Sequence, residues 1–428
     1  MQKKLKELVI GKMEKIDKFI PFWILVMTWE SVAQWMNFEL FLGGWWIEHL
    51  LCFMLPVSFV IYYNYNSTNL QKTPFIFKTF FFLLFCNMVY GLFMSEGYQD
   101  TQTMFAKLIS WTLCTGWFYF QEPDNVAKVT REWFKYAILL FFILVVFMQG
   151  EAVGRFFAPC AFVVIFFPYL DKKWKLRIAV VVAIVLLMGA LGARSSIIRF
   201  GVGILLAIAI SFQRVYPKVL TKILFILFVS LPVVLLYLGI TDQFNVFKFQ
   251  EEFGLEEVEV NSSFDNGDTE DLTGDTRTFL FVEEIQSAIK NDYVVYGRSL
   301  SRGYDSIVID DVDWKHGRNE RWSSEVRFLN VFNYMGLIGV AIVALLYIIG
   351  AWKAVFKSKS FAMKMIGLYV AFRWLYGWIE DFDRFDLINL YIWIPIFMCY
   401  SEKFLKKNDA EFKMWAKNIF KNESVCKR

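Results

Sequence analysis

Long apolar stretches recur along this chain, and they constrain its fold more than any other feature. Each is about 17–24 residues long, close to the roughly 20 residues that a helix needs to cross a ~30 Å hydrocarbon core. Hydrophobic residues make up 57% of the 428, against roughly 45–50% in soluble chains. The chain is therefore predicted to be an all-α polytopic membrane protein with about 12 transmembrane helices. The predicted spans are residues 19–36, 43–62, 75–94, 104–120, 133–149, 153–170, 176–193, 196–212, 219–240, 328–350, 361–378 and 386–402.

The positions of lysine and arginine predict which ends of these helices face the cytoplasm. Cytoplasmic loops carry an excess of Lys and Arg, and here every second connection is basic. Two of the opposite connections, 95–100 and 380–384, are acidic. Twelve spans with both termini in the cytoplasm satisfy this pattern. The basic segments are 1–18, 121–135, 171–177, 213–222, 353–364 and the tail from residue 402.

This topology divides the rest of the chain into membrane parts and two cytoplasmic ends. Residues 19–240 hold spans one to nine, and residues 328–402 hold spans ten to twelve. Residues 1–18 form a basic amphipathic segment, and residues 403–428 form a cytoplasmic tail. Both ends are predicted to lay an apolar face on the inner leaflet. In the tail that face consists of Phe412, Trp415, Ile419 and Phe420.

A large extracytoplasmic lobe is predicted between spans nine and ten, at residues 241–327. It is acidic, with 20 Asp and Glu against eight Lys and Arg over residues 242–326. Residues 250–274 are rich in acidic residues, Asn, Ser and Gly, which predicts a flexible loop. A helical pattern then begins at Asp275, the predicted N-cap.

Ionisable residues inside the predicted spans are the first candidates for a functional site, because they are costly in lipid. Most of them fall in the outer half of the membrane, which predicts a polar cavity that opens outward. The alternative for each residue is a snorkelling or mutually paired structural charge. Arginine suits bidentate recognition of phosphate, so a lipid-linked phosphate or diphosphate is a candidate ligand. These residues are Glu30, Glu48, His49, Arg155, Arg194, Arg199, Arg373 and Glu380.

The sequence predicts neither a metal nor another cofactor. The chain has two histidines and six cysteines, with no CxxC pair and no Cys/His cluster. The acidic loop lacks the calcium-binding pattern of EF-hands. A net charge of +4 in so apolar a chain indicates no nucleic-acid partner.

Three motifs resemble the O-antigen polymerase and ligase superfamily. Glu325-Val-Arg-Phe-Leu-Asn-Val-Phe-Asn-Tyr-Met-Gly-Leu-Ile-Gly339 is similar to a family segment in which His-Asn precedes Phe-Leu and Gly-Leu-Ile-Gly. Gly-Ala-Arg194-Ser-Ser resembles the family's Ser-Arg element. Asp275-Thr-Arg277-Thr-Phe, a helix and the glycine-containing segment 296–303 resemble its arginine-bearing helix and the turn that follows. The order of the motifs, the large lobe and the number of spans match as well.

The resemblance implies a GT-C-like membrane glycosyltransferase of the bacterial cytoplasmic membrane. Such an enzyme polymerises undecaprenyl-pyrophosphate-linked oligosaccharide units on the outer face, and chain-length regulator and flippase proteins are expected partners. Glu325 falls where the family has a histidine, counted back from Gly336, and is the expected base. Arg194 and Arg277 are expected to hold the donor diphosphate, helped by Arg298, Arg302 or Arg327.

Alternatives remain open at each level. Glu325 could instead form a salt bridge with Arg321, Arg327 or another arginine, and Arg277 could be a solvated residue in the first turn of a helix. A ligase would use the same donor and another acceptor. A flippase or exporter of the same lipid would need sites that are reachable from both faces, whereas the charged residues here crowd the outer half.

Overall fold

The structure is a computed structural model that describes residues 2–33, 45–148, 152–188, 194–241, 244–245, 259–261, 269–271, 277–306 and 318–421. Helices make up most of this part of the chain, which confirms the predicted all-α class. The α-helices are α1 (Gln2–Ala33), α2 (Trp45–Asn66), α3 (Phe75–Met94), α4 (Tyr98–Trp111), α5 (Trp117–Phe120), α6 (Pro123–Leu144), α7 (Ala152–Phe156), α8 (Ala158–Val164), α9 (Lys172–Met188), α10 (Arg194–Ser211), α11 (Lys218–Ile240), α13 (Thr278–Lys290), α14 (Arg327–Trp352), α15 (Phe361–Tyr376), α16 (Leu387–Tyr400), α17 (Glu402–Leu405) and α18 (Asp409–Asn418).

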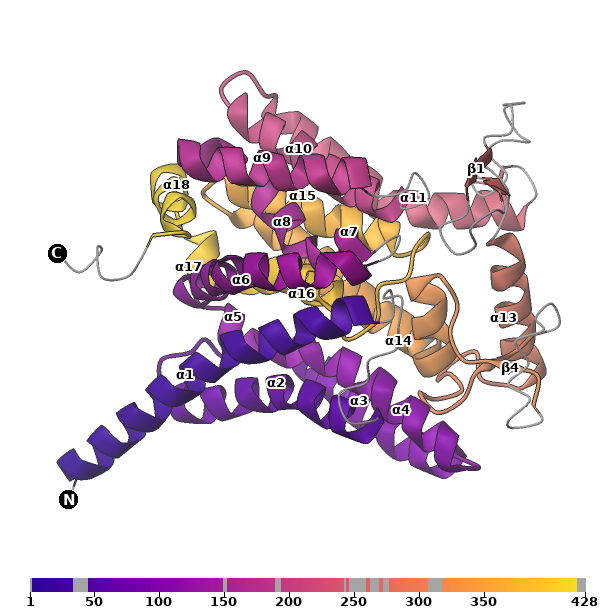
Figure 1. The fold of residues 1–428 in the computed structure, drawn as a ribbon. Coiled ribbons are helices and arrows are strands. Elements are labelled where there is room, and N and C mark those ends of the chain that lie inside the picture. Colours follow the sequence, from indigo (N-terminus) through magenta and orange to yellow (C-terminus); the bar gives the residue numbers. More distant parts are fainter. Residues whose placement is uncertain are drawn as a thin grey trace.

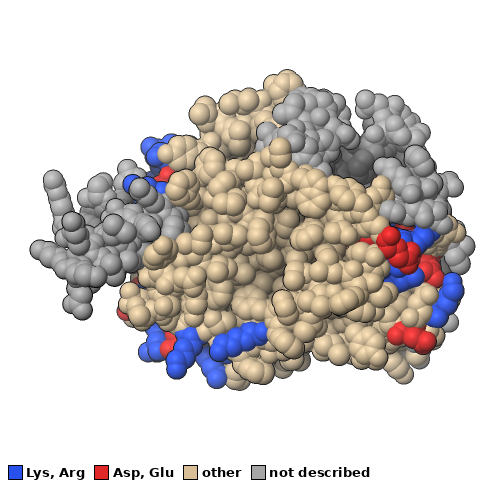
Figure 2. Space-filling view, turned by 90° about the horizontal axis from the view of Figure 1, so that it is seen from below, with Lys and Arg blue, Asp and Glu red and all other residues tan. Residues whose placement is uncertain are grey.

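Several of the described helices have the properties of membrane spans. Those long and apolar enough to cross a membrane are Trp46–Asn66, Phe75–Met94, Lys218–Gly239 and Arg327–Lys357. Large apolar side chains on their outer surfaces are exposed, among them Phe93 and Val233, and such surface needs lipid to cover it. Figure 2 shows a broad uncharged band on one face, with charged side chains gathered at its two ends.

The long helices run side by side, and the ends of the molecule differ (Figure 1). The start of α1 lies at one end with α17 and α18, whereas α13 and the short strands lie at the opposite end. The core between the helices is continuous and rich in aromatic residues. For example, Phe77 of α3 stacks on Trp117 of α5, with ring centroids 5.4 Å apart.

The predicted span at 153–170 is not one helix, and that prediction is wrong. The chain forms α7, α8 and a 3-10 turn at Phe167–Tyr169 instead. Pro159 and Pro168 stand at the starts of the second and third pieces, since proline has no amide hydrogen to continue a helix. This segment is buried, so the protein rather than lipid surrounds its irregular backbone.

Both ends of the chain that were predicted to lie in the cytoplasm differ from their predicted form. The backbone of α1 is helical from Gln2 to Ala33, without a break where an amphipathic segment was predicted to end. In the tail, Phe412, Trp415 and Ile419 are buried. Trp415 packs against Phe166, with ring centroids 5.6 Å apart. The predicted contact of these tail residues with the leaflet is therefore wrong, because the protein itself covers their apolar face.

In its described residues, the segment predicted as a lobe contains α13 and two short hairpins. Helix α13 begins at Thr278, three residues after the predicted start, and Asp275 lies outside the described residues. Of the predicted loop 250–274, the structure describes only antiparallel β1 (Glu259–Asn261) and β2 (Thr269–Asp271). Strands β3 (Tyr304–Asp305) and β4 (Glu320–Arg321) form the second hairpin.

Candidate functional site

A break in α14 brings two of the sequence motifs into contact. Gly336 and Gly297 both have positive φ, +61° and +77°, a conformation that favours glycine. A Cβ on Gly297 would clash with the backbone of Met335, and a Cβ on Gly336 would clash with the backbone of Val295. Beyond the break, the Ile338 amide donates to the Val295 carbonyl at 3.2 Å. The glycines of both motifs therefore allow the lobe backbone to dock onto the start of α14.

Asn87 of α3 forms hydrogen bonds with both segments that meet at the break in α14. Its side-chain amide nitrogen donates to the carbonyl of Tyr334, and its amide oxygen accepts from the backbone amide of Leu300 at 3.0 Å. The side chain is buried. Sequence reasoning did not select Asn87, although a polar residue within an apolar span was a signal that could have found it.

Arg277 and Glu325 meet at the start of α13, together with Glu380. The Nη2 atom of Arg277 lies 3.7 Å from Oε2 of Glu325 and 3.6 Å from Oε2 of Glu380. Glu325 also approaches Arg321, at 3.8 Å. Its side chain is 58% exposed, so these ion pairs contribute roughly 0–1 kcal/mol to stability. The structure thus brings the predicted base and one predicted donor-binding arginine together.

Helix α13 positions Arg277 at its N-cap rather than in its first turn. The residue has φ −131° and ψ −24°, and its side chain makes no capping hydrogen bond. The positive end of the helix dipole disfavours a cation at this position. Two carboxylates offset that effect here, and an anionic ligand would do the same.

The connection between α15 and α16 supplies the acids that pair with outer arginines. Besides Glu380, it contributes Asp383 to Arg327 and Asp386 to Arg155, at 2.8 and 3.5 Å. Arg327, one of the predicted helpers in holding the donor diphosphate, is fully buried. The acidic run at 380–384 was predicted only as an outer loop. Its residues prove to be the counter-ions of this region.

Arg298 and Arg302 lie in a separate ion-pair network, away from Glu325. Arg302 forms two hydrogen bonds with Glu320 and one with Glu96, the last at 2.7 Å. Arg298 pairs with Asp305 at 2.7 Å and with Glu320 at 3.2 Å. Hydrogen bonds of this charge-assisted kind occupy the guanidinium groups. The network joins the second hairpin to the connection between α3 and α4.

Arg318 completes this network and was not selected from the sequence. It donates to Glu96 at 2.7 Å and also contacts buried Asp100. Hydrogen bonds from Arg318 and Arg302 lower the pKa of Glu96. The arginine-rich end of the lobe is therefore tied to membrane helices by fixed charges.

Arg194 begins α10, and the structure describes its backbone only. The following residues, Ser195 and Ser196, are buried. Ser196 lies so close to Gly154 of α7 that a Cβ on that glycine would clash with its hydroxyl. The structure therefore anchors the motif that contains Arg194 against α7 and leaves the predicted role of its side chain untested.

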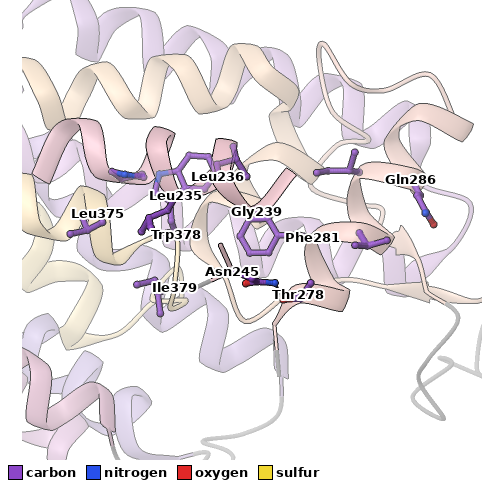
Figure 3. A pocket seen from close by; sticks show the side chains of 13 residues that line it. Leu235, Leu236, Gly239, Asn245, Thr278, Phe281, Gln286, Leu375, Trp378 and Ile379 are labelled. Carbon is purple, nitrogen blue, oxygen red and sulfur yellow. Dashed lines mark hydrogen bonds between the residues drawn. The ribbon is translucent and has the colours of Figure 1, made fainter. Parts of the chain in front are cut away.

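An apolar groove of about 410 Å³ lies on one side of Arg277. Figure 3 shows side chains from α11, α13 and the end of α15 pointing into the same space. Such a volume is in the range of small-molecule sites, and its walls include α11, several of whose apolar side chains are exposed. The lining includes Pro232, Leu235, Leu236, Gly239, Thr278, Phe281, Val282, Ile285, Leu375, Trp378 and Ile379.

A separate polar cavity of about 200 Å³ is lined in part by residues of the connection between α15 and α16. Its walls include Glu30, His49 and Arg155, which were selected as ionisable residues within the predicted spans, and Glu48 forms a side-chain hydrogen bond with Glu30. Lys107, which the sequence analysis overlooked, also lines the cavity. The remaining lining includes Ser31, Ser110, Trp111, Ser323, Asn330, Tyr334, Asp381, Asp383, Arg384 and Asp386.

Three consecutive residues connect the apolar groove, the ion-pair cluster and the polar cavity. Ile379 lines the groove, Glu380 pairs with Arg277, and Asp381 lines the cavity. On the lobe side, Thr278 next to Arg277 also lines the groove. The cluster of Arg277, Glu325 and Glu380 is therefore flanked in sequence by residues that line the apolar groove and by a residue that lines the polar cavity.

Glu284 of α13 is fully buried. Because burial affects its protonation, the stability of the protein should depend on pH. Burial raises the pKa of Glu284 well above its ordinary value of 4.5. The stability that the protonated group contributes is present below the unfolded value and is lost as pH rises through the folded value. Thermal unfolding between about pH 5 and pH 9 should therefore show a steeper loss of stability in the wild type than in Glu284→Gln. Glu402→Gln, at an exposed position, should behave as the wild type. Parallel curves for the wild type and Glu284→Gln would contradict this expectation.

Within the described ranges, no group of three or more His, Cys, Asp or Glu side chains is placed to hold a metal ion. Comparison with known proteins adds no assignment. The chain matches no protein-family model, no curated protein and no solved structure.

Proposed function

We propose that this protein is a membrane glycosyltransferase that polymerises oligosaccharide units linked to a polyprenyl diphosphate. The proposal rests on the surroundings of three consecutive residues. Ile379 lines the apolar groove, Glu380 pairs with Arg277, and Asp381 lines the polar cavity. A substrate with a hydrocarbon chain, a diphosphate and a sugar has the same order of chemistry. The resemblance of the three motifs to O-antigen polymerases and ligases supports the same assignment.

In this proposal the membrane arrangement follows the charge pattern. Several long apolar helices make the protein a candidate for a membrane. We assign it to the bacterial cytoplasmic membrane, with about 12 spans, both termini in the cytoplasm and residues 241–327 on the outer face. The starts of α1 and the tail helices lie at the end of the molecule opposite to α13 (Figure 1), as this arrangement requires.

The proposed donor occupies the groove and the cluster. Its hydrocarbon chain lies between α11 and α13, where lipid-facing apolar side chains continue into the groove. Its diphosphate binds Arg277 and replaces the carboxylates of Glu325 and Glu380, which pair with this arginine in the structure. Arg194 is assigned to the same diphosphate, on the resemblance of its motif. Arginine then stabilises the negative charge that develops on the leaving group.

The proposed acceptor is the terminal sugar of a second lipid-linked unit in the polar cavity. Its carboxylate, amide and hydroxyl side chains suit a hydroxyl-rich ligand, and Trp111 and Tyr334 add aromatic surface. An acceptor hydroxyl attacks the anomeric carbon, the carbon–oxygen bond to the diphosphate breaks, and the hydroxyl proton passes to Glu325. A single displacement of this kind inverts the configuration at that carbon.

Purified protein incubated with lipid-linked repeat units provides the direct test. We expect a ladder of glycans that differ by one repeat unit, together with released polyprenyl diphosphate, on gel and mass analysis. A product of one length, formed only when a different acceptor is added, would assign the protein to the ligases. Movement of the lipid across vesicles without any new glycosidic bond would reject the enzyme and favour a flippase.

A further inference from the structure

Two buried arginines in the helix bundle form no ion pair with any acid among the described residues. Arg373 of α15 is 1% exposed, and none of its three guanidinium nitrogens has a hydrogen-bond partner among the described residues. Arg199 of α10 is 5% exposed. One of its nitrogens makes a long bond of 3.4 Å to the Gly154 carbonyl, and its Nε has no partner.

Neighbouring charges increase this imbalance. Arg373 and Arg155 are both close enough to interact electrostatically with Arg199, and all three carry the same sign. Asp386 pairs with Arg155 at 3.5 Å and also interacts electrostatically with Arg199, without forming an ion pair with it. Within the described ranges, no ion pair joins an acid to Arg199 or to Arg373, whereas Arg155 and Arg327 each have one and Arg277 has two.

Aromatic rings are the closest compensation that Arg373 has. Its guanidinium carbon lies 4.0 Å from the ring centroid of Phe382 and 5.4 Å from that of Tyr376. Such cation–π contacts offset only part of the loss of hydration. A buried guanidinium is strongly unfavourable unless it is paired and hydrogen-bonded. Two neighbouring buried guanidinium groups without ion pairs are what a binding site for an anion requires.

The pair lies directly beside the candidate site. Tyr376 interacts electrostatically with Arg199, Arg373 and Arg277 alike. Phe382, which covers Arg373, stands between Asp381 and Asp383, and both of these line the polar cavity. Displacement of the Phe382 ring would therefore open a path from Arg199 and Arg373 to the polar cavity, the space proposed for the acceptor.

We propose that Arg199 and Arg373 form a binding site for a diphosphate, reached from the polar cavity when Phe382 moves aside. Two guanidinium groups offer enough donors to hold the oxygens of one diphosphate. The identification of the ligand as a lipid-linked diphosphate, a second one besides the donor diphosphate at Arg277, rests on the proposed function. The existence of an anion site does not, because it is argued from the absence of ion pairs to Arg199 and Arg373 among the described residues.

Binding to purified full-length protein tests the site with three probes: farnesyl diphosphate, inorganic pyrophosphate and farnesol. Arg373→Met should weaken farnesyl diphosphate binding by about 10–100-fold, and Arg373→Lys should weaken it less, because an ammonium keeps the charge and loses the fork. Arg214→Met, at an exposed position, should bind as the wild type. Farnesol binding should not depend on Arg373. Equal dependence on Arg373 for pyrophosphate would identify the diphosphate alone as the ligand, without its lipid.

Thermal unfolding without ligand separates this role from a structural one. If Arg373 is kept for a ligand, Arg373→Met should unfold at a higher temperature than the wild type, because an unpaired buried charge is gone. Addition of farnesyl diphosphate should then stabilise the wild type only. Unchanged binding by Arg373→Met and Arg199→Met would overturn the proposal, even if the protein makes polymer. Binding that depends on Arg373 without any ladder of glycans would instead preserve the anion site and reject the polymerase.

Discussion

Glu325→Gln should lower the turnover of lipid-linked repeat units by roughly 10²–10⁴-fold, the usual contribution of a general base. The amide keeps the shape of the side chain and cannot accept the proton of the acceptor hydroxyl. Glu325→Ala should be equally impaired. Glu325→His should retain part of the activity, because imidazole is a base and the resembling family has histidine here. The measurement is the initial rate of polymer formation by purified variants.

The structure distinguishes this role from that of a salt bridge. The side chain of Glu325 is 58% exposed, and its contacts with Arg277 and Arg321 are 3.7 and 3.8 Å long. Loss of such pairs changes the free energy of unfolding by about 1 kcal/mol at most. Glu325→Gln should therefore be as abundant and as stable as Glu402→Gln, an exposed control that breaks a pair with Lys406. Normal turnover in Glu325→Gln would remove this residue from the mechanism.

Arg277→Ala should reduce turnover by roughly 10²–10³-fold, the range seen when one preorganised donor to a developing negative charge is removed. The diphosphate leaving group would lose a guanidinium whose neighbour in the chain, Thr278, lines the groove. Arg277→Lys should recover only part of the rate, since an ammonium cannot form the two parallel hydrogen bonds of a guanidinium. Rates at saturating substrate, with purified variants in detergent, give the comparison.

Arg321→Ala is the matched control for this experiment. It removes the other arginine that approaches Glu325, without touching the groove. If Arg277 acts on the donor, Arg321→Ala should keep most of the activity. Equal losses in both variants would indicate that the arginines serve only to orient Glu325. Wild-type rates in Arg277→Ala would show that the diphosphate binds elsewhere.

Prediction from the sequence succeeded where one local property decided the outcome. The predicted span 75–94 coincides with α3, and 219–240 differs from α11 by one residue. A long apolar run in lipid has to satisfy its backbone internally, so helix is the available solution. The same reasoning failed at 153–170, because a buried segment with two prolines can leave the helical path when protein surrounds it.

For the candidate site, the sequence supplied the residues and the tertiary structure supplied the partners. Glu325, Arg277 and Glu380 were all selected from the sequence. Their separation along the chain did not show that Arg277 forms ion pairs with both carboxylates. The structure assigns Arg298 and Arg302 to a network with Glu320 and Glu96, although sequence reasoning grouped them with Arg277. Ion pairs depend on the packing of elements that are distant in sequence, and no periodicity records that packing.

By itself, the sequence determined the helical class, the membrane character and the positions of most helices. The length of an apolar run is a local property that can be read directly from the sequence. It also marked the glycines of the motifs. Only the tertiary structure decided that Gly297 and Gly336 meet, and that this contact docks the lobe onto a broken α14. Only the tertiary structure showed that Arg277 has counter-ions, whereas Arg373 has none in the part of the chain that the structure describes. Charge balance within a fold is a property of the whole set of neighbours, which three-dimensional packing alone brings together.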